Sequence, residues 1–206
     1  MTSTTKKMEI KKKDYDYVTN FLIDLSQKAS RKIMEIYNNE FSFKNKNDKS
    51  PITLADLYSH KIIVESLKDK FGGTEIISEE SINKKLKSKN FFLIDPLDGT
   101  KEFIKKNDEF TVNIAYLKNL KPIISVITIP AKNIYYFTNG FESFKTNNDG
   151  KTKKIISRSN YDELRLVVSR SHLDVKSKNF LNKIENKKVF KRESSLKFCM
   201  IAEGEA

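Results

Sequence analysis

FFLIDPLDGT, residues 91–100, runs from four apolar residues into two aspartates, Asp95 and Asp98, and then into Gly99 and Thr100. The apolar run predicts a buried strand, so the two carboxylates stand at its carboxyl end, where open α/β sheets bind their ligands. Carboxylates this close repel one another unless a cation lies between them. Mg²⁺ is the simplest such cation, because it is a hard ion that prefers oxygen ligands.

The size and composition of the chain fit a globular protein. Its 206 residues can bury a sizeable core, and its apolar runs are too short to span a bilayer. Residues 1–13 lack the apolar segment of a secretory signal, so we expect a disordered basic tail, with Met1 or Met8 as the true start. The single cysteine, Cys199, excludes an internal disulfide and fits a reducing cytoplasm. Peripheral attachment to the cytoplasmic face of the inner membrane is the alternative location.

The net charge of +12 makes nucleic acid a partner to consider. However, only five of the 39 basic residues are arginine, which reads phosphate and bases better than lysine does. The lysines are also spread along the whole chain. We therefore expect no polymeric nucleic acid as a partner, whereas a small anionic substrate agrees with the charge. The sequence predicts no particular oligomeric state.

Hydrophobic periodicity predicts a mixed α/β chain. Spacings of three and four predict a helix over residues 14–40 and a second one that opens at Ser50-Pro51 and closes at Gly72-Gly73. Further helices are predicted over 175–186 and 196–202, and strands over 75–78, 91–94, 110–117, 122–130, 134–138, 141–145, 166–169 and 189–190. We expect a metal-binding α+β part over 14–150 and an incomplete α/β part over 151–206.

Three acidic groups are candidates for one metal site, namely Asp56, Glu79 and the Asp95/Asp98 pair. Glu79 follows the apolar pair Ile76-Ile77, so it also stands at a strand end, and two neighbouring strands would bring these carboxylates together. The alternative for Glu79 is a solvated turn, and the alternative for Asp98 is a helix N-cap.

Several segments together resemble a known family. SPITLAD (50–56), ISEES (77–81) and DPLDGT (95–100) are similar in order and context to the lithium-sensitive, Mg²⁺-dependent phosphatases, which include inositol monophosphatases, fructose-1,6-bisphosphatases and 3′(2′),5′-bisphosphate nucleotidases. Three further segments resemble the bacterial nucleotidase branch, CysQ, in particular. They are EFIKKNDEFTVNIA (102–115), VVSRSH (167–172) and SSLKFCMIAEGEA (194–206). The resemblance implies a layered αβαβα sandwich whose last strands and helix are missing.

The same resemblance implies roles for individual residues. Two or three Mg²⁺ ions would bind, one at Glu79, Asp95 and the carbonyl of Leu97, and a second at Asp95 and Asp98. One ion would activate the attacking water while another stabilises the leaving oxygen. Asp56 and Glu79 would position that water, with Thr100 hydrogen-bonded to it. The implied substrate contacts are Asp98, Gly99, Thr100, Ser169, His172, Ser194 and Lys197.

The implied reaction removes the 3′-phosphate of adenosine 3′,5′-bisphosphate (PAP) to give AMP, as in sulfate assimilation and nucleotide recycling, with its sulfated relative PAPS as a further substrate. One alternative is an inositol monophosphatase, which the SRSH and SSLK segments disfavour. Another is an inactive truncated remnant that only binds anions or nucleic acid.

The chain departs from the nucleotidase pattern at two places. Glu193 stands where the pattern usually has Gly, and a carboxylate beside a phosphate site is electrostatically unfavourable. The Trp-Asp segment that supplies the last metal ligand is also missing, since the chain contains no Trp. We therefore expect a C-terminally truncated member that binds Mg²⁺ weakly and turns over PAP poorly.

Overall fold

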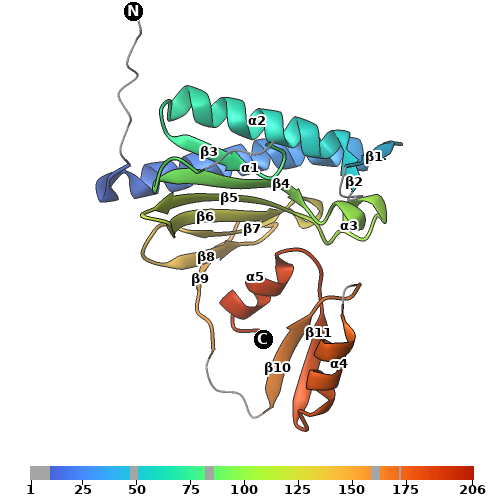
Figure 1. The fold of residues 1–206 in the computed structure, drawn as a ribbon. Coiled ribbons are helices and arrows are strands. Elements are labelled where there is room, and N and C mark those ends of the chain that lie inside the picture. The colour runs from blue at the N-terminus through green and yellow to red at the C-terminus, as the bar shows by residue number, and fades with distance from the viewer. Residues whose placement is uncertain (1–9, 47–50, 82–85, 159–162, 172) are drawn as a thin grey trace, which may run out of the picture.

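The computed structural model describes residues 10–46, 51–81, 86–158, 163–171 and 173–206. Its layers alternate between helix and sheet (Figure 1). Helices α1 (Tyr15–Tyr37) and α2 (Leu54–Lys70) cover one face of a large sheet, and α5 (Leu196–Ala202) lies on its other side. A small sheet and then α4 (Val175–Asn182) follow, which confirms the predicted αβαβα order.

The large sheet has seven strands in the order β3-β4-β5-β6-β7-β8-β9. Only β3 and β4 are parallel, and each later strand is antiparallel to the one before it. The strands span Glu75–Ser78, Phe91–Asp98, Thr111–Lys118, Lys121–Ile129, Ile134–Thr138, Ser143–Thr146 and Thr152–Ile155.

The register of the parallel pair places two predicted ligands side by side. Ser78 of β3 is paired with Ile94 of β4, so that the residues which follow, Glu79 and Asp95, emerge at the same edge. The N–H of Glu79 donates to the carbonyl of Ile94 over 3.1 Å. This confirms the prediction that neighbouring strand ends bring the two carboxylate-bearing motifs together.

The main core lies between the helices and the large sheet. Helix α1 buries the stripe predicted from its periodicity, including Val18, Leu22 and Ile33, against α2 and β6. Each fully buried side chain of this size contributes about 1.5–3 kcal/mol to the free energy of unfolding. Phe103 and Phe110 add an aromatic cluster beneath the start of α3 (Thr100–Ile104), so the segment that follows the DPLDGT motif is firmly anchored.

The start of α2 differs from the prediction. Pro51–Thr53 forms strand β2, which pairs with β1 (Phe43–Asn45), and the helix begins only at Leu54. The cause is a capping box, in which Thr53 accepts from the N–H of Ala55 and Asp56 accepts from the N–H of Thr53. The prediction of a helix from Ser50-Pro51 was wrong for residues 51–53, and Ser50 lies outside the described residues.

The predicted boundaries of the two parts also shift. Residues 143–146 and 152–155 form the β8–β9 hairpin at the edge of the large sheet, so a boundary at residue 150 would cut a hairpin. Ile10 is fully buried and Lys12–Asp14 form a 3-10 turn, so the packed chain extends N-terminal to Asp14. Of the predicted basic tail, residues 1–9 lie outside the described part.

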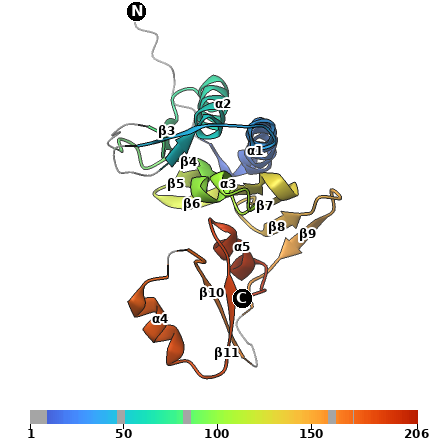
Figure 2. The same cartoon turned by 90° about the vertical axis from the view of Figure 1, so that its right-hand side faces the viewer.

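The small sheet pairs β10 (Leu164–Val168) with β11 (Lys187–Lys191) in parallel, joined through α4. Figure 2 shows α4 beside these strands and farther from the large sheet than α5. Helix α5, by contrast, packs against the large sheet. Its Leu196 and Cys199 cluster with Ile129 of β6, Tyr136 of β7 and Ile155 of β9. The last helix therefore joins the two parts. None of the described helices is long and apolar enough to cross a membrane.

Candidate active site

The first site residue, Asp56, is held by the capping box of α2. Its Oδ2 accepts from the N–H of Thr53 over 2.7 Å and from the hydroxyl of Thr53 over 2.6 Å. Its Oδ1 accepts from the hydroxyl of Thr100 over 3.0 Å. Asp56 is only 2% exposed, and this burial raises its pKa against the effect of the hydrogen bonds from Thr53 and Thr100. Asp56 therefore acts on the site through Thr100.

The end of β4 is irregular. The pairing with β5 shifts register between Asp95 and Asp98. The buried hydroxyl of Ser59 donates to the carbonyl of Pro96 over 2.7 Å, and the hydroxyl of Thr100 lies 3.3 Å from the carbonyl oxygen of Leu97. The first contact fixes the backbone of the motif from α2, and the second lies within the turn into α3.

Gly99 makes the turn from β4 into α3 possible. Its φ is +89°, a left-handed conformation that other residues adopt only with strain. A Cβ at this position would lie 3.0 Å from the backbone oxygen of Glu109. The turn therefore requires glycine for both its backbone conformation and its close packing.

The carboxylates at this edge interact strongly. Burial, followed by the negative charges of Asp98 and Glu79, raises the pKa of Asp95 to about 8. The N–H of Leu97 donates to Asp95 Oδ1 over 3.3 Å but does not offset these effects. Without a cation, this group therefore retains a proton in neutral solution.

A lysine that sequence reasoning missed lies beside Glu79. Lys46, just after β1, places its Nζ 2.6 Å from Glu80 Oε1 and 3.5 Å from Glu79 Oε1. The Glu80 side chain is buried, whereas that of Glu79 is 54% exposed. Nothing in the local sequence distinguishes Lys46 from other lysines, because its position depends on the β1–β2 pairing.

The donor set fits a hard divalent cation. Glu79, Asp95, Asp98 and the carbonyl of Leu97 supply only oxygen, and burial together with the charges of Asp98 and Glu79 raises the pKa of Asp95. Within the described ranges, no three His, Cys, Asp or Glu side chains already stand at metal-binding spacing.

Most of the other predicted site residues line one cleft of about 490 Å³ next to this edge. Its wall includes Glu79, Asp98, Gly99, Thr100, Ser169, Ser194 and Lys197, together with Lys101, Glu102, Glu193 and others. The structure thus brings together residues that lie more than 100 positions apart in the chain. His172, also predicted to contact substrate, lies outside the described residues.

Ser194 connects the C-terminal wall of the cleft to the motif. Its hydroxyl donates to Asp98 Oδ2 over 2.6 Å and lies 2.8 Å from the hydroxyl oxygen of Thr111. Its backbone has a φ of +54°, in the left-handed region. Lys197 Nζ donates to the carbonyl of Ser194 over 2.9 Å, which keeps the ammonium group at the cleft.

Two linked acidic residues, Glu193 in the wall of the cleft and Glu109, had no predicted role in binding. Glu193 accepts from the hydroxyl of Ser169 over 2.9 Å, and its N–H donates to Glu109 Oε2 over 3.0 Å. Glu109 also pairs with Arg170, with Oε1 2.7 Å from Nη2. The departure from the family pattern at residue 193 was the only sequence signal for this cluster.

Comparison with known proteins gives the family. Residues 14–206 match the inositol monophosphatase family. The 3′(2′),5′-bisphosphate nucleotidase CysQ of Escherichia coli K12 is 37% identical over 187 residues, which are 88% of this chain and 75% of that protein. The protein of the same name from Buchnera aphidicola (subspecies Acyrthosiphon pisum) is 40% identical over 190 residues, covering 90% of this chain and 71% of that protein.

The solved structures agree with the sequence matches. The crystal structure of CysQ from Bacteroides thetaiotaomicron is 33% identical, with a TM-score of 0.74 over 89% of this chain and 75% of that one. Sequence, fold and motifs therefore lead to the same conclusion, and the resemblance seen in the motifs is confirmed. This chain belongs to the inositol monophosphatase family, which is metal-dependent.

Proposed function

We propose that this chain is a Mg²⁺-dependent phosphatase of the 3′(2′),5′-bisphosphate nucleotidase type, which converts PAP to AMP. The observation that carries the proposal is the convergence of Glu79, Asp98 and Thr100 on one cleft, with Asp95 at the same strand edge. The identity to nucleotidases over most of the chain supports the substrate class. PAPS is a candidate for a second substrate.

Glu79, Asp95, Asp98 and the carbonyl of Leu97 are the groups that would hold Mg²⁺, in two or three positions. When bound, the cation lowers the pKa of a water molecule and neutralises charge on the phosphoryl oxygens. The half-exposed carboxylate of Glu79 is the acceptor we assign to the proton of the attacking water.

Thr100 orients that water. Its hydroxyl proton is directed to Asp56 Oδ1, so the lone pairs of Oγ1 can accept a hydrogen bond from a water molecule in the cleft. The water oxygen then bonds to phosphorus, the bond from phosphorus to the ribose 3′-oxygen breaks, and that oxygen takes up a proton. Asp56 is a positioning residue in this scheme, because its contacts are to Thr53 and Thr100.

The substrate lies between the motif and the C-terminal wall. We assign the scissile phosphate to Asp98, Gly99 and Thr100, and the nucleotide to Ser169, Ser194 and Lys197, with His172 as a further predicted contact. The ammonium of Lys197 supplies the positive charge that an anionic nucleotide requires.

The test is phosphate release from PAP by the purified chain as MgCl₂ is added after treatment with EDTA. We expect release that depends on Mg²⁺ and that is lost in Asp98→Asn. Asp149→Asn is the matched control, because it removes the same charge from the exposed turn between β8 and β9. Isothermal titration of Mg²⁺ provides a second readout that does not depend on turnover.

The alternatives give different results in the same assay. Faster release from inositol 1-phosphate than from PAP would favour an inositol monophosphatase. Salt-dependent binding of DNA or RNA, without phosphate release from any substrate, would favour a non-catalytic anion-binding protein. A cytoplasmic location, with or without peripheral attachment to the membrane, stays a prediction of the sequence.

A further inference from the structure

The carboxylate of Glu193 lies in the wall of the cleft among hydrogen-bond donors. Its Oε2 accepts from the hydroxyl of Ser169 over 2.9 Å, and its Oε1 accepts from the N–H of Ser171 over 2.5 Å. Only 4% of Glu193 is exposed. Burial favours its neutral form, but the hydrogen bonds and the charge of Lys197 outweigh burial and lower its pKa. Glu193 is therefore a negative charge inside the cleft at neutral pH.

The groups around Glu193 are of the kind that binds phosphate. A hydroxyl, a backbone N–H and an ammonium are the donors that proteins use for phosphate oxygens. Ser169 and Lys197 line the same cleft as Asp98 and Thr100, where we place the scissile phosphate. Two of these donors, the hydroxyl of Ser169 and the N–H of Ser171, are already bonded to the carboxylate of Glu193.

Glu193 is also anchored through its backbone. Its N–H donates to Glu109 Oε2, and Glu109 is fixed in turn by its ion pair with Arg170. Glu109 is itself buried. The carboxylate of Glu193 is therefore held from two sides, and a ligand that displaces it must break its contacts with Ser169 and Ser171.

We propose that Glu193 is a specificity-determining residue whose carboxylate competes with the second phosphate of PAP for the Ser169 hydroxyl and the Ser171 N–H, and so weakens the binding of PAP. This inference rests on the proposed phosphatase function. A second phosphate must either displace the carboxylate or lie beside its negative charge, and both disfavour binding. A 3′-phosphorylated nucleoside without a second phosphate meets neither obstacle.

The experiment compares the binding of PAP and adenosine 3′-monophosphate by isothermal titration at pH 7.5 with Mg²⁺. For the wild-type chain we expect PAP to bind no more tightly than the monophosphate. In Glu193→Gln and Glu193→Gly we expect the affinity for PAP to rise about tenfold or more, while that for the monophosphate changes less than about threefold. The φ of Glu193 is not positive, so glycine is not needed there for conformation alone.

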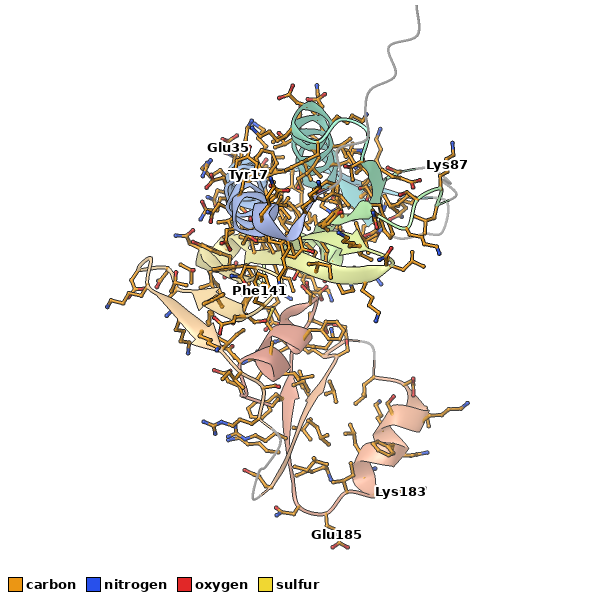
Figure 3. All side chains as sticks on the ribbon, turned by 90° about the vertical axis from the view of Figure 1, so that its left-hand side faces the viewer. Tyr17, Glu35, Lys87, Phe141, Lys183 and Glu185 are labelled. Carbon is orange, nitrogen blue, oxygen red and sulfur yellow. The ribbon has the colours of Figure 1, made fainter. Side chains whose placement is uncertain are left out.

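Glu185→Gln is the matched control. It removes the same charge from an exposed residue at the end of the molecule opposite Tyr17 and Glu35 of α1 (Figure 3). We expect both affinities to stay unchanged in this variant. Thermal unfolding curves establish that each variant is folded, and the wild-type ratio of affinities tests the inference even where both Glu193 variants fail to fold.

The outcomes separate this inference from the proposed function. Tenfold tighter binding of PAP than of the monophosphate by the wild-type chain would overturn the inference, as would an equal rise for both nucleotides in the Glu193 variants. Absence of phosphate release from either nucleotide, in wild type and variants alike, would overturn the proposed function. The ratio of affinities would still decide the role of Glu193.

Discussion

The hydroxyl of Thr100 donates a hydrogen bond to Asp56 across 44 positions of sequence, with Oγ1 3.0 Å from Oδ1. The other oxygen of Asp56 is held by Thr53, which caps α2. The first turn of α2 therefore fixes the orientation of the residue that begins α3. A helix cap in this protein thus supports the geometry of the cleft as well as the stability of its helix.

Thr100→Ala tests this contact. Loss of the hydroxyl removes both the orientation of the water and the partner of Asp56 Oδ1, so we expect kcat to fall on the order of 100-fold with little change in KM. The free energy of unfolding should fall by about 1 kcal/mol, the value of one such hydrogen bond. Thr100→Ser keeps the hydroxyl and should retain most of the activity. An equal loss in both variants would show that the methyl group matters instead.

The stability of the metal-free protein should depend on Asp95 and on pH. Asp95 has a pKa of about 8 in the folded protein, mainly through burial, against an ordinary value of 3.8. Between these values the folded protein keeps a proton that the unfolded chain has released. Asp95 therefore stabilises the fold at low pH, and this contribution is lost as the pH rises from about 4 to about 8.

Thermal unfolding in EDTA at several pH values checks this sign. Asp95→Asn, which cannot ionise, should become more stable relative to wild type as the pH rises through this window. Mg²⁺ should also bind the wild-type chain more tightly at pH 8 than at pH 6, because binding displaces the proton. A difference in melting temperature that does not change with pH would contradict the shifted pKa.

Gly99→Ala should be strongly destabilising. The new Cβ would need a left-handed backbone and would lie 3.0 Å from the oxygen of Glu109 and 3.3 Å from the Cα of Phe110, neither of which can move aside easily. We expect a loss of about 2–4 kcal/mol, the sum of backbone strain and crowding. Gly150→Ala is the control, since its φ is +79° but no atom lies within 4 Å of the new Cβ. It should cost only about 1–2 kcal/mol, and equal losses would rule out crowding.

Cys199 offers a measure of how firmly α5 is docked. It is buried, and burial together with the charge of Glu203 raises its pKa to about 12, so its thiol should react slowly with thiol reagents. Glu203 holds α5 to the sheet through Lys145, at 2.6 Å, and Tyr136, at 2.8 Å. Glu203→Gln should speed the modification of Cys199 about tenfold by favouring local opening. The exposed Glu205→Gln should leave the rate unchanged, and equal rates in all three proteins would contradict the anchoring role of Glu203.

Local patterns predicted a large part of the fold. The apolar stripe of α1, the strand that leads into DPLDGT and the last helix at 196–202 all appear as expected, because periodicity records which face of each element is buried. The pairing of β3 with β4 also followed from two motifs that each end a strand. For the same reason, the acidic edge of the site was accessible from the sequence.

The remaining features depend on contacts distant in sequence. Strand β9 is lysine-rich and shows no apolar alternation, and it is a strand because β8 offers it an edge. Lys46 reaches Glu80, and Glu193 reaches Ser169 and Glu109, over separations that no local pattern encodes. The sequence thus predicted candidate groups for the chemistry, but not the ion pairs and hydrogen bonds that orient them.

The bond between Ser194 and Asp98 joins residues 96 positions apart. The sheet can pair while a ribosome is still adding residues 164–206, since its strands follow one another in sequence before them. The cleft cannot close at that stage, because its second wall has not yet been synthesised. During biosynthesis the protein therefore passes through a state in which its acidic edge is already built but has no opposing surface. Binding of substrate should begin only when α5 docks.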